Sequence, residues 1–133
     1  MAAAVLDAHA LLAFFRGEDA GVPVKELLQK AATADRPLHM TEVNYAEVQY
    51  IIIRKNGLAG WETAAASLVS LPITFHPITR ELADIAARMK ASHRISLADA
   101  FVSALAKHRK CELVTGDPEF KTMERELKIA WLK

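Results

Sequence analysis

The sequence lacks several features that define other classes of protein. Its single cysteine, Cys111, excludes an internal disulfide and a cysteine-based metal site, and favours a reducing compartment. No apolar run approaches the ~20 residues that a membrane-spanning helix requires. Asp7 and His9 interrupt the apolar N-terminal segment, which also lacks a basic leader. We therefore expect a cytoplasmic protein with no membrane partner.

The net charge and the length of the chain bear on its possible partners and on its number of domains. The 17 lysines and arginines nearly balance the 16 aspartates and glutamates, so the formal net charge of +1 argues neither for nor against a polyanionic partner. The chain has 133 residues, of which 52% are hydrophobic, and this is enough for one core. We expect a single domain over residues 1–133.

Short apolar runs alternate with helical patterns along the chain. Strand-like runs lie at residues 3–6, 38–40, 71–77, 112–114 and 129–132. Helical patterns lie at residues 8–15, 23–31, 41–55, 61–70, 80–91, 96–107 and 120–127. This alternation predicts an α/β fold with a central parallel β-sheet flanked by helices on both faces. Pro72 and Pro77 favour an edge position for the third strand.

Four acids stand where an apolar run gives way to a helical pattern. Asp7 and Asp117 directly follow predicted strands, whereas Glu47 and Asp99 lie a few residues inside predicted helices. The strand-to-helix turns of a parallel sheet all lie at its carboxyl edge, where ligands bind in open α/β sheets. We therefore expect the four carboxylates to lie close together in space.

Each acid also has a purely structural interpretation. Asp7 and Asp117 suit the N-cap position of a helix, and the pairs Asn44 with Glu47 and Ser96 with Asp99 match capping boxes. For any one acid this interpretation is at least as good as a functional one. The coincidence of four acids at helix starts among small or apolar neighbours favours a shared cation.

An all-oxygen set of ligands without cysteine or paired histidine predicts Mg²⁺, with Mn²⁺ as the alternative, rather than zinc. Because Mg²⁺ commonly shares its coordination sphere with substrate phosphate, phosphodiester chemistry is the first expectation.

Other polar residues lie near these acids in the sequence. Glu42 is a minor competitor of Glu47 for the second acidic position. Thr115 could bind an acid or a phosphate, or could simply be a β-branched strand residue. His9 could touch substrate, although a lone histidine at a helix start is more often structural. Arg94 belongs to a basic group that could contact a nucleic-acid backbone, and the group consists of Arg88, Lys90, His93 and Arg94.

The motifs around the acids resemble those of PIN-domain nucleases, and the length resembles that of VapC-type toxins from toxin–antitoxin pairs. The motifs are residues 5–8 (VLDA), 44–48 (NYAEV), 95–100 (ISLADA) and 113–120 (LVTGDPEF). The resemblance implies that Asp7, Glu47, Asp99 and Asp117 hold one or two divalent ions, and that Thr115 is the hydroxyl residue preceding the last acid. It also implies cleavage of single-stranded RNA, a homodimer and inhibition by an antitoxin.

Together, the four acids and the resemblance predict a divalent-metal-dependent endoribonuclease that is the toxin of a toxin–antitoxin pair. The same four acids would have the catalytic and the metal-binding roles. The alternative is a catalytically inert domain of the same fold that binds RNA or protein. A phosphate-transfer or signalling domain is disfavoured, because the first strand is not followed by an adjacent acidic pair and no phosphate-binding glycine loop is present.

Overall fold

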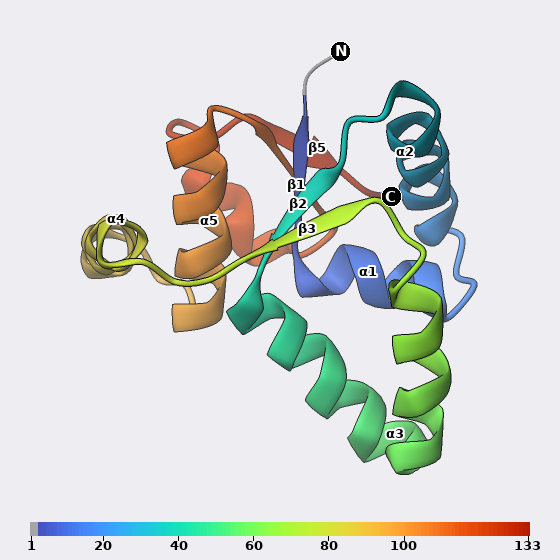
Figure 1. Cartoon of the computed structure of the whole chain (residues 1–133). Coiled ribbons are helices and arrows are strands. Elements are labelled where there is room, and N and C mark those ends of the chain that lie inside the picture. The colour runs from blue at the N-terminus through green and yellow to red at the C-terminus, as the bar shows by residue number, and fades with distance from the viewer. Residues whose placement is uncertain (1–2) are drawn as a thin grey trace.

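The computed structural model describes residues 3–133 and has a five-stranded parallel sheet at its centre (Figure 1). The strands are β1 (Ala4–Leu6), β2 (Leu38–Thr41), β3 (Ile73–His76), β4 (Glu112–Thr115) and β5 (Ile129–Trp131). Their order across the sheet is β3-β2-β1-β4-β5, and each neighbouring pair is parallel. The predicted α/β class and the edge position of the third strand are confirmed.

Helices cover both faces of the sheet, as the sequence predicts (Figure 1). They are α1 (Ala8–Phe15), α2 (Gly21–Ala34), α3 (Glu42–Leu68), α4 (Arg80–Ser92) and α5 (Leu97–Arg109), and a 3-10 helix, η1, spans Pro118–Met123. Alternate residues of β1 point to opposite faces. Val5 packs into a core with residues of α4 and α5, whereas Leu6 packs with residues of α2. Both side chains are fully buried, which accounts for the uninterrupted apolar run of this central strand.

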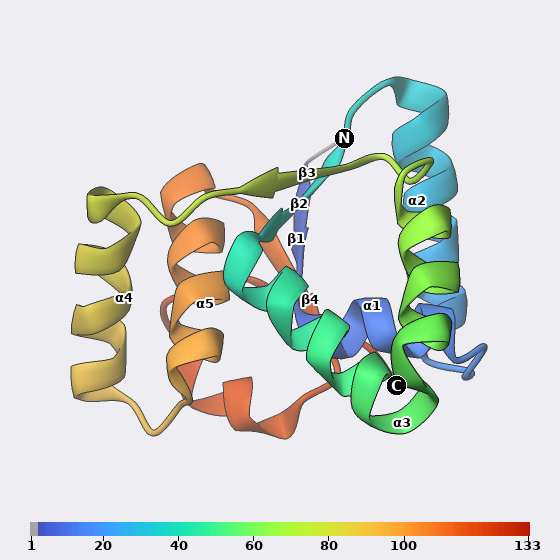
Figure 2. The ribbon, with the colours of Figure 1, turned by 60° about the horizontal axis from the view of Figure 1, so that its bottom comes forward.

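Helix α3 is bent at Gly57, where the sequence predicts that one helix ends and another follows. Gly57 has φ 73° and ψ 178°, a conformation that side-chain-bearing residues rarely adopt. The bend reverses the course of the chain, so that the two arms of α3 form a V in Figure 2. Ile52 from the first arm and Trp61 from the second then enter the same core cluster.

The predicted helix at residues 120–127 is wrong in type and position. The chain forms the 3-10 helix η1 over Pro118–Met123, followed by turns. Phe120 and Met123 are fully buried, and their spacing of three residues places them on one face of a helix with three residues per turn. Burial of this pair therefore favours the tighter helix.

Among residues 3–133, no helix is both long enough and apolar enough to cross a membrane.

We predict that Gly57→Ala destabilises the protein by about 1–2 kcal/mol, because alanine is strained at this positive φ although space for its Cβ is available. The measurement is the free energy of unfolding in urea. Leu58→Ala, at an exposed neighbouring position, is the control and should change stability by less than about 0.5 kcal/mol. Equal stability of Gly57→Ala and the wild type would contradict the role given to the bend.

Candidate active site

Asp7 lies in the turn between β1 and α1 and is almost completely buried, with 3% of its surface exposed. Its Oδ1 accepts a hydrogen bond from the Ala10 backbone N–H at 2.8 Å, so the residue caps α1 as the sequence predicts. Its Oδ2 accepts a hydrogen bond from the hydroxyl of buried Thr115. Both carboxylate oxygens are therefore held in fixed positions.

Thr115 also fixes the last acid. Its Oγ1 accepts a hydrogen bond from the Asp117 backbone N–H at 3.0 Å while donating to Asp7. Asp117 in turn caps η1, since its Oδ1 accepts from the Glu119 N–H at 2.9 Å. Because β1 and β4 are neighbours in the sheet, this hydroxyl joins acids that are 110 positions apart in the sequence.

Glu47 projects from α3 and is held by Asn44. The Asn44 side-chain amide donates to Glu47 Oε1 at 2.9 Å and to the Ala98 carbonyl oxygen of α5 at 3.3 Å. The expected capping box with Asn44 as the cap is not formed. Thr41 is the N-cap and accepts from the Asn44 N–H at 3.0 Å, which leaves the fully buried Asn44 side chain to join α3 to α5.

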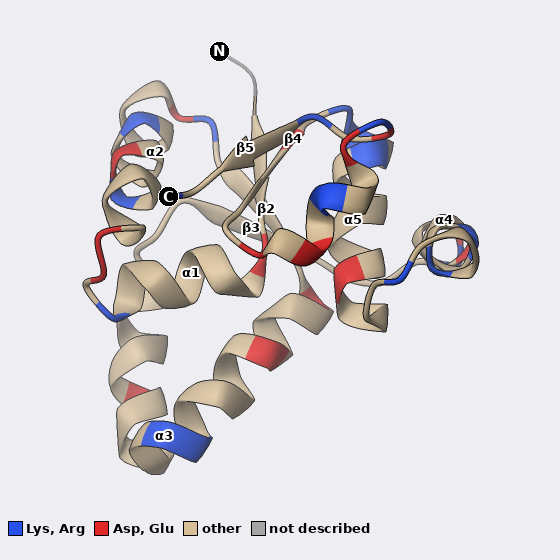
Figure 3. Ribbon diagram, turned by 180° about the vertical axis from the view of Figure 1, so that it is seen from behind, with Lys and Arg blue, Asp and Glu red and all other residues tan. Residues whose placement is uncertain are grey.

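Asp99 lies in the first turn of α5, which Ser96 caps. The Ser96 Oγ accepts from the Asp99 N–H at 3.1 Å, as the sequence predicts. The Asp99 carboxylate also interacts with the Ser96 side chain, and this interaction lowers the pKa of Asp99. Figure 3 shows acidic segments of α3, α5 and the β4–η1 connection around the ends of the central strands.

The four predicted acids interact electrostatically: Asp117 and Glu47 act on Asp7, and all three act on Asp99. Burial, with smaller contributions from the charges of Asp117 and Glu47, raises the pKa of Asp7 to about 7, although the hydrogen bonds from Thr115 and Ala10 lower it. Burial also raises the pKa of Asp99 to about 7, with added repulsion from Asp117, Glu47 and Asp7. Burial and Asp117 likewise raise the pKa of Glu47.

The most closely spaced carboxylates include one that the sequence analysis missed. Oxygen atoms of Asp99, Asp117 and Glu119 all lie within 4.8 Å of one another. Glu119 is two residues beyond Asp117 in the turn that Pro118 begins, and the hydrogen bond from its N–H to Asp117 turns it towards the same site. The sequence signal that could have identified Glu119 is its place directly after Asp117 and Pro118, a pair typical of a helix start.

Glu42 and Glu47 lie in different surroundings. It is exposed at the first position of α3, whereas Glu47 is one of the charges that act on both Asp7 and Asp99. The geometry favours Glu47 over its competitor.

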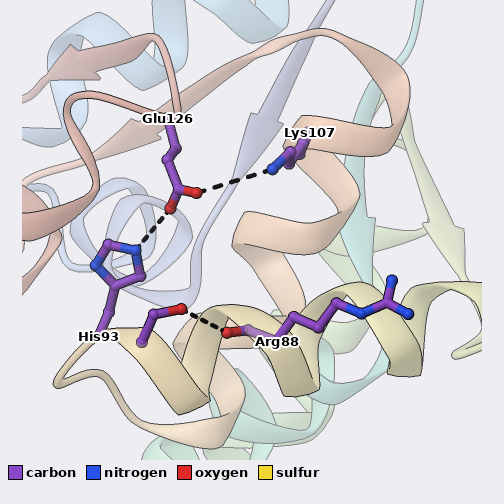
Figure 4. A network of polar contacts seen from close by, with 5 residues as sticks. Arg88, His93, Lys107 and Glu126 are labelled. Carbon is purple, nitrogen blue, oxygen red and sulfur yellow. Dashed lines mark hydrogen bonds and ion pairs between the residues drawn. The ribbon is translucent and has the colours of Figure 1, made fainter.

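The predicted basic group is divided in the structure. Lys90 Nζ donates to the Ile95 carbonyl oxygen at 2.8 Å, and His93 Nε2 lies 2.6 Å from Glu126 Oε2. Figure 4 shows His93 and Lys107 converging on Glu126, with Lys107 Nζ 3.9 Å from Oε1. Lys90 and His93 thus anchor the α4–α5 connection. Arg94 is exposed and makes no hydrogen bond or ion pair within residues 3–133.

The donor set suits a hard divalent cation. All the candidate ligands are carboxylate oxygens, which Mg²⁺ and Mn²⁺ prefer. A cation would also offset the burial and repulsion that raise the pKa of Asp7 and Asp99. Within residues 3–133, Asp99, Asp117 and Glu119 are spaced closely enough to share one ion.

The family model described as PIN domain matches residues 4–126. The chain belongs to the PIN domain family. Solved structures with the same fold include VapBC2 from Rickettsia felis bound to a DNA fragment from its promoter, with a TM-score of 0.74, 16% identity and 98% of each chain covered. No curated protein sequence matches the chain.

Two further structures share this PIN fold. One is a toxin–antitoxin complex from Klebsiella pneumoniae, with a TM-score of 0.70, 17% identity and 96% of each chain covered. The other is VapC20 from Mycobacterium tuberculosis, described as a sarcin-ricin loop cleaving toxin, with a TM-score of 0.68 and 19% identity. That match covers 91% of this chain and 95% of VapC20.

We predict that Thr115→Val lowers the free energy of unfolding by about 1–3 kcal/mol, because valine leaves the Asp117 N–H and a buried Asp7 oxygen without their partner. Thr115→Ser keeps the hydroxyl and is the matched control. Urea unfolding of both variants provides the measurement. A valine variant as stable as the serine variant would contradict this account.

The pKa of Asp99 predicts how stability depends on pH. Because the pKa is higher in the folded protein than the usual 3.8, the metal-free protein loses stability from this group as pH rises from about 4 to about 7. Asp99→Asn removes that titration. We expect the variant to be more stable than the wild type by on the order of 2 kcal/mol at pH 8, and equally stable near pH 3. Urea unfolding in EDTA measures the difference, and a gap that does not change with pH would refute it.

Proposed function

We propose that this PIN domain is a divalent-metal-dependent endoribonuclease and acts as the toxin of a toxin–antitoxin pair. The observation that carries the proposal is the convergence of Asp7, Glu47, Asp99 and Asp117 at the carboxyl edge of the sheet, where mutual repulsion helps to raise the pKa of Asp7 and Asp99. Such repulsion destabilises the metal-free fold, and a bound cation relieves it.

The four acids are the proposed catalytic and metal-binding residues, with Mg²⁺ as the ion and Mn²⁺ as the alternative. Asp99 and Asp117 are the central ligands, and Glu119 adds a third oxygen donor close to both. Asp7 faces the same site with its carboxylate fixed by Thr115, and Asn44 fixes Glu47. When bound, a divalent ion polarises a phosphate and lowers the pKa of a water molecule for in-line attack.

The protein contributes position and charge to this reaction. The hydrogen bonds to Asp7 and Glu47 hold their carboxylates before substrate arrives, so less reorganisation is needed during the reaction. Thr115 positions Asp7 and Asp117 through its hydrogen bonds, and it affects substrate only through these two acids. Arg94 is exposed in the connection that leads to Asp99, and we propose that it contacts the RNA backbone.

The proposed partners are RNA, an antitoxin protein and a second copy of the chain in a homodimer. Structures of this fold that include toxin–antitoxin complexes, and VapC20 described as cleaving the sarcin-ricin loop, support the toxin role. Because the proposed substrate is RNA, the proposal places the protein in the cytoplasm.

The test is incubation of the purified protein with total RNA, with Mg²⁺ or with EDTA, followed by mapping of the cut ends. We expect specific cleavage with Mg²⁺ and none with EDTA. Asp7→Asn and Asp99→Asn should each lower the rate by at least about 100-fold, since loss even of a group behind a ligand costs 10–100-fold. Asp84→Asn, on the exposed face of α4, is the control and should cleave normally. Full activity in both site variants would refute the assignment.

Metal titration separates this proposal from an inert RNA- or protein-binding domain. We predict that Mg²⁺ and Mn²⁺ raise the melting temperature of the wild type saturably, because an ion that binds only the folded state stabilises it. Asp99→Asn should lose most of this shift. Absence of saturable stabilisation by either ion would favour the inert domain.

A further inference from the structure

His9 lies beside the acidic site but belongs to none of its hydrogen-bonded groups. It follows Asp7 by two residues in the first turn of α1, and its side chain is exposed. Within residues 3–133 it makes no hydrogen bond or ion pair. An exposed ring contributes little to the stability of the core, so its position at this edge calls for a different explanation.

The His9 ring occupies the space that a side chain at Gly116 would fill. A Cβ placed on Gly116 would lie 2.6 Å from Cε1 of His9 and 3.2 Å from its Nδ1. Gly116 lies between Thr115 and Asp117, the residues that fix Asp7 and the last acid. The glycine therefore lets the ring rest directly against the backbone of the proposed site.

We propose that His9 binds the RNA nucleotide next to the scissile phosphate, and that Gly116 provides the space that holds its ring there. The inference rests on the proposed function. An RNA strand whose phosphate reaches the carboxylates must pass the residues at their edge, and an exposed imidazole can stack on an unpaired base or hydrogen-bond to its edge. The ring is also already supported by Gly116, so less conformational freedom is lost on binding.

The first experiment measures kcat/KM and KM on an RNA fragment that carries the cut site mapped in total RNA. His9→Ala should lower kcat/KM about 30-fold, the middle of the range for loss of one stacked base, mainly through KM. Its melting temperature should match that of the wild type. His108→Ala is the matched control and should retain full activity. It removes an exposed histidine in the last turn of α5, whereas Asp99 lies in the first turn of that helix.

Two further variants identify the contact. His9→Phe keeps a flat ring and His9→Asn keeps a hydrogen-bonding group. Recovery of most of the lost kcat/KM by either variant supports binding through His9 and assigns the contact to stacking or to hydrogen bonding.

Gly116→Ala tests the support for the ring. In the wild type the new methyl group displaces His9, so this change should lower kcat/KM as His9→Ala does. In the His9→Ala background the clash is absent, and adding Gly116→Ala should change kcat/KM less than twofold. Such non-additivity is expected only for residues that act together.

The outcomes separate the inference from the proposal on which it rests. If the wild type cuts RNA and His9→Ala has kcat/KM within twofold of it, the inference is overturned and the nuclease proposal stands. If Gly116→Ala lowers kcat/KM by the same factor in the wild type and in His9→Ala, the role given to Gly116 is overturned. If the wild type cuts nothing in total RNA, both proposals fail.

Discussion

The candidate site depends on one hydroxyl group. Thr115 donates to Asp7 at the end of β1 and accepts from the Asp117 N–H at the end of β4. Direct parallel pairing of β1 with β4 places these groups side by side, with Leu6 opposite Val114 in the register. The sheet therefore sets the spacing of the first and last acids, and Thr115 fixes their orientation.

Carboxylate clustering opposes the stability of the fold that produces it. Burial and repulsion raise the pKa of Asp7 and Asp99 to about 7, although helix capping and hydrogen bonds partly counteract the shift at each residue. A fold selected for stability alone would place neutral caps at these positions. The repulsion among these acids, which the packing holds near one another, is the physical reason for the proposed cation binding.

Much of this arrangement could be predicted from sequence, because strand burial and helix starts are local. The apolar run of β1, the proline-flanked edge strand β3 and the bend at Gly57 each had a clear local pattern. The role of Asn44 did not, since it depends on the approach of α5 to α3. Glu119 was missed because the tight η1 turn, stabilised by buried Phe120 and Met123, determines where its carboxylate lies.

The two hydrogen bonds donated by Asn44 have a mechanical consequence. One side-chain amide holds both Glu47 and the Ala98 carbonyl oxygen, which belongs to the residue preceding Asp99. Sliding of α3 along α5 would stretch this link and pull on the Glu47 carboxylate. Movements between the two helices, including any that a protein bound at a distant face imposes, would thus be transmitted to the geometry of the acids.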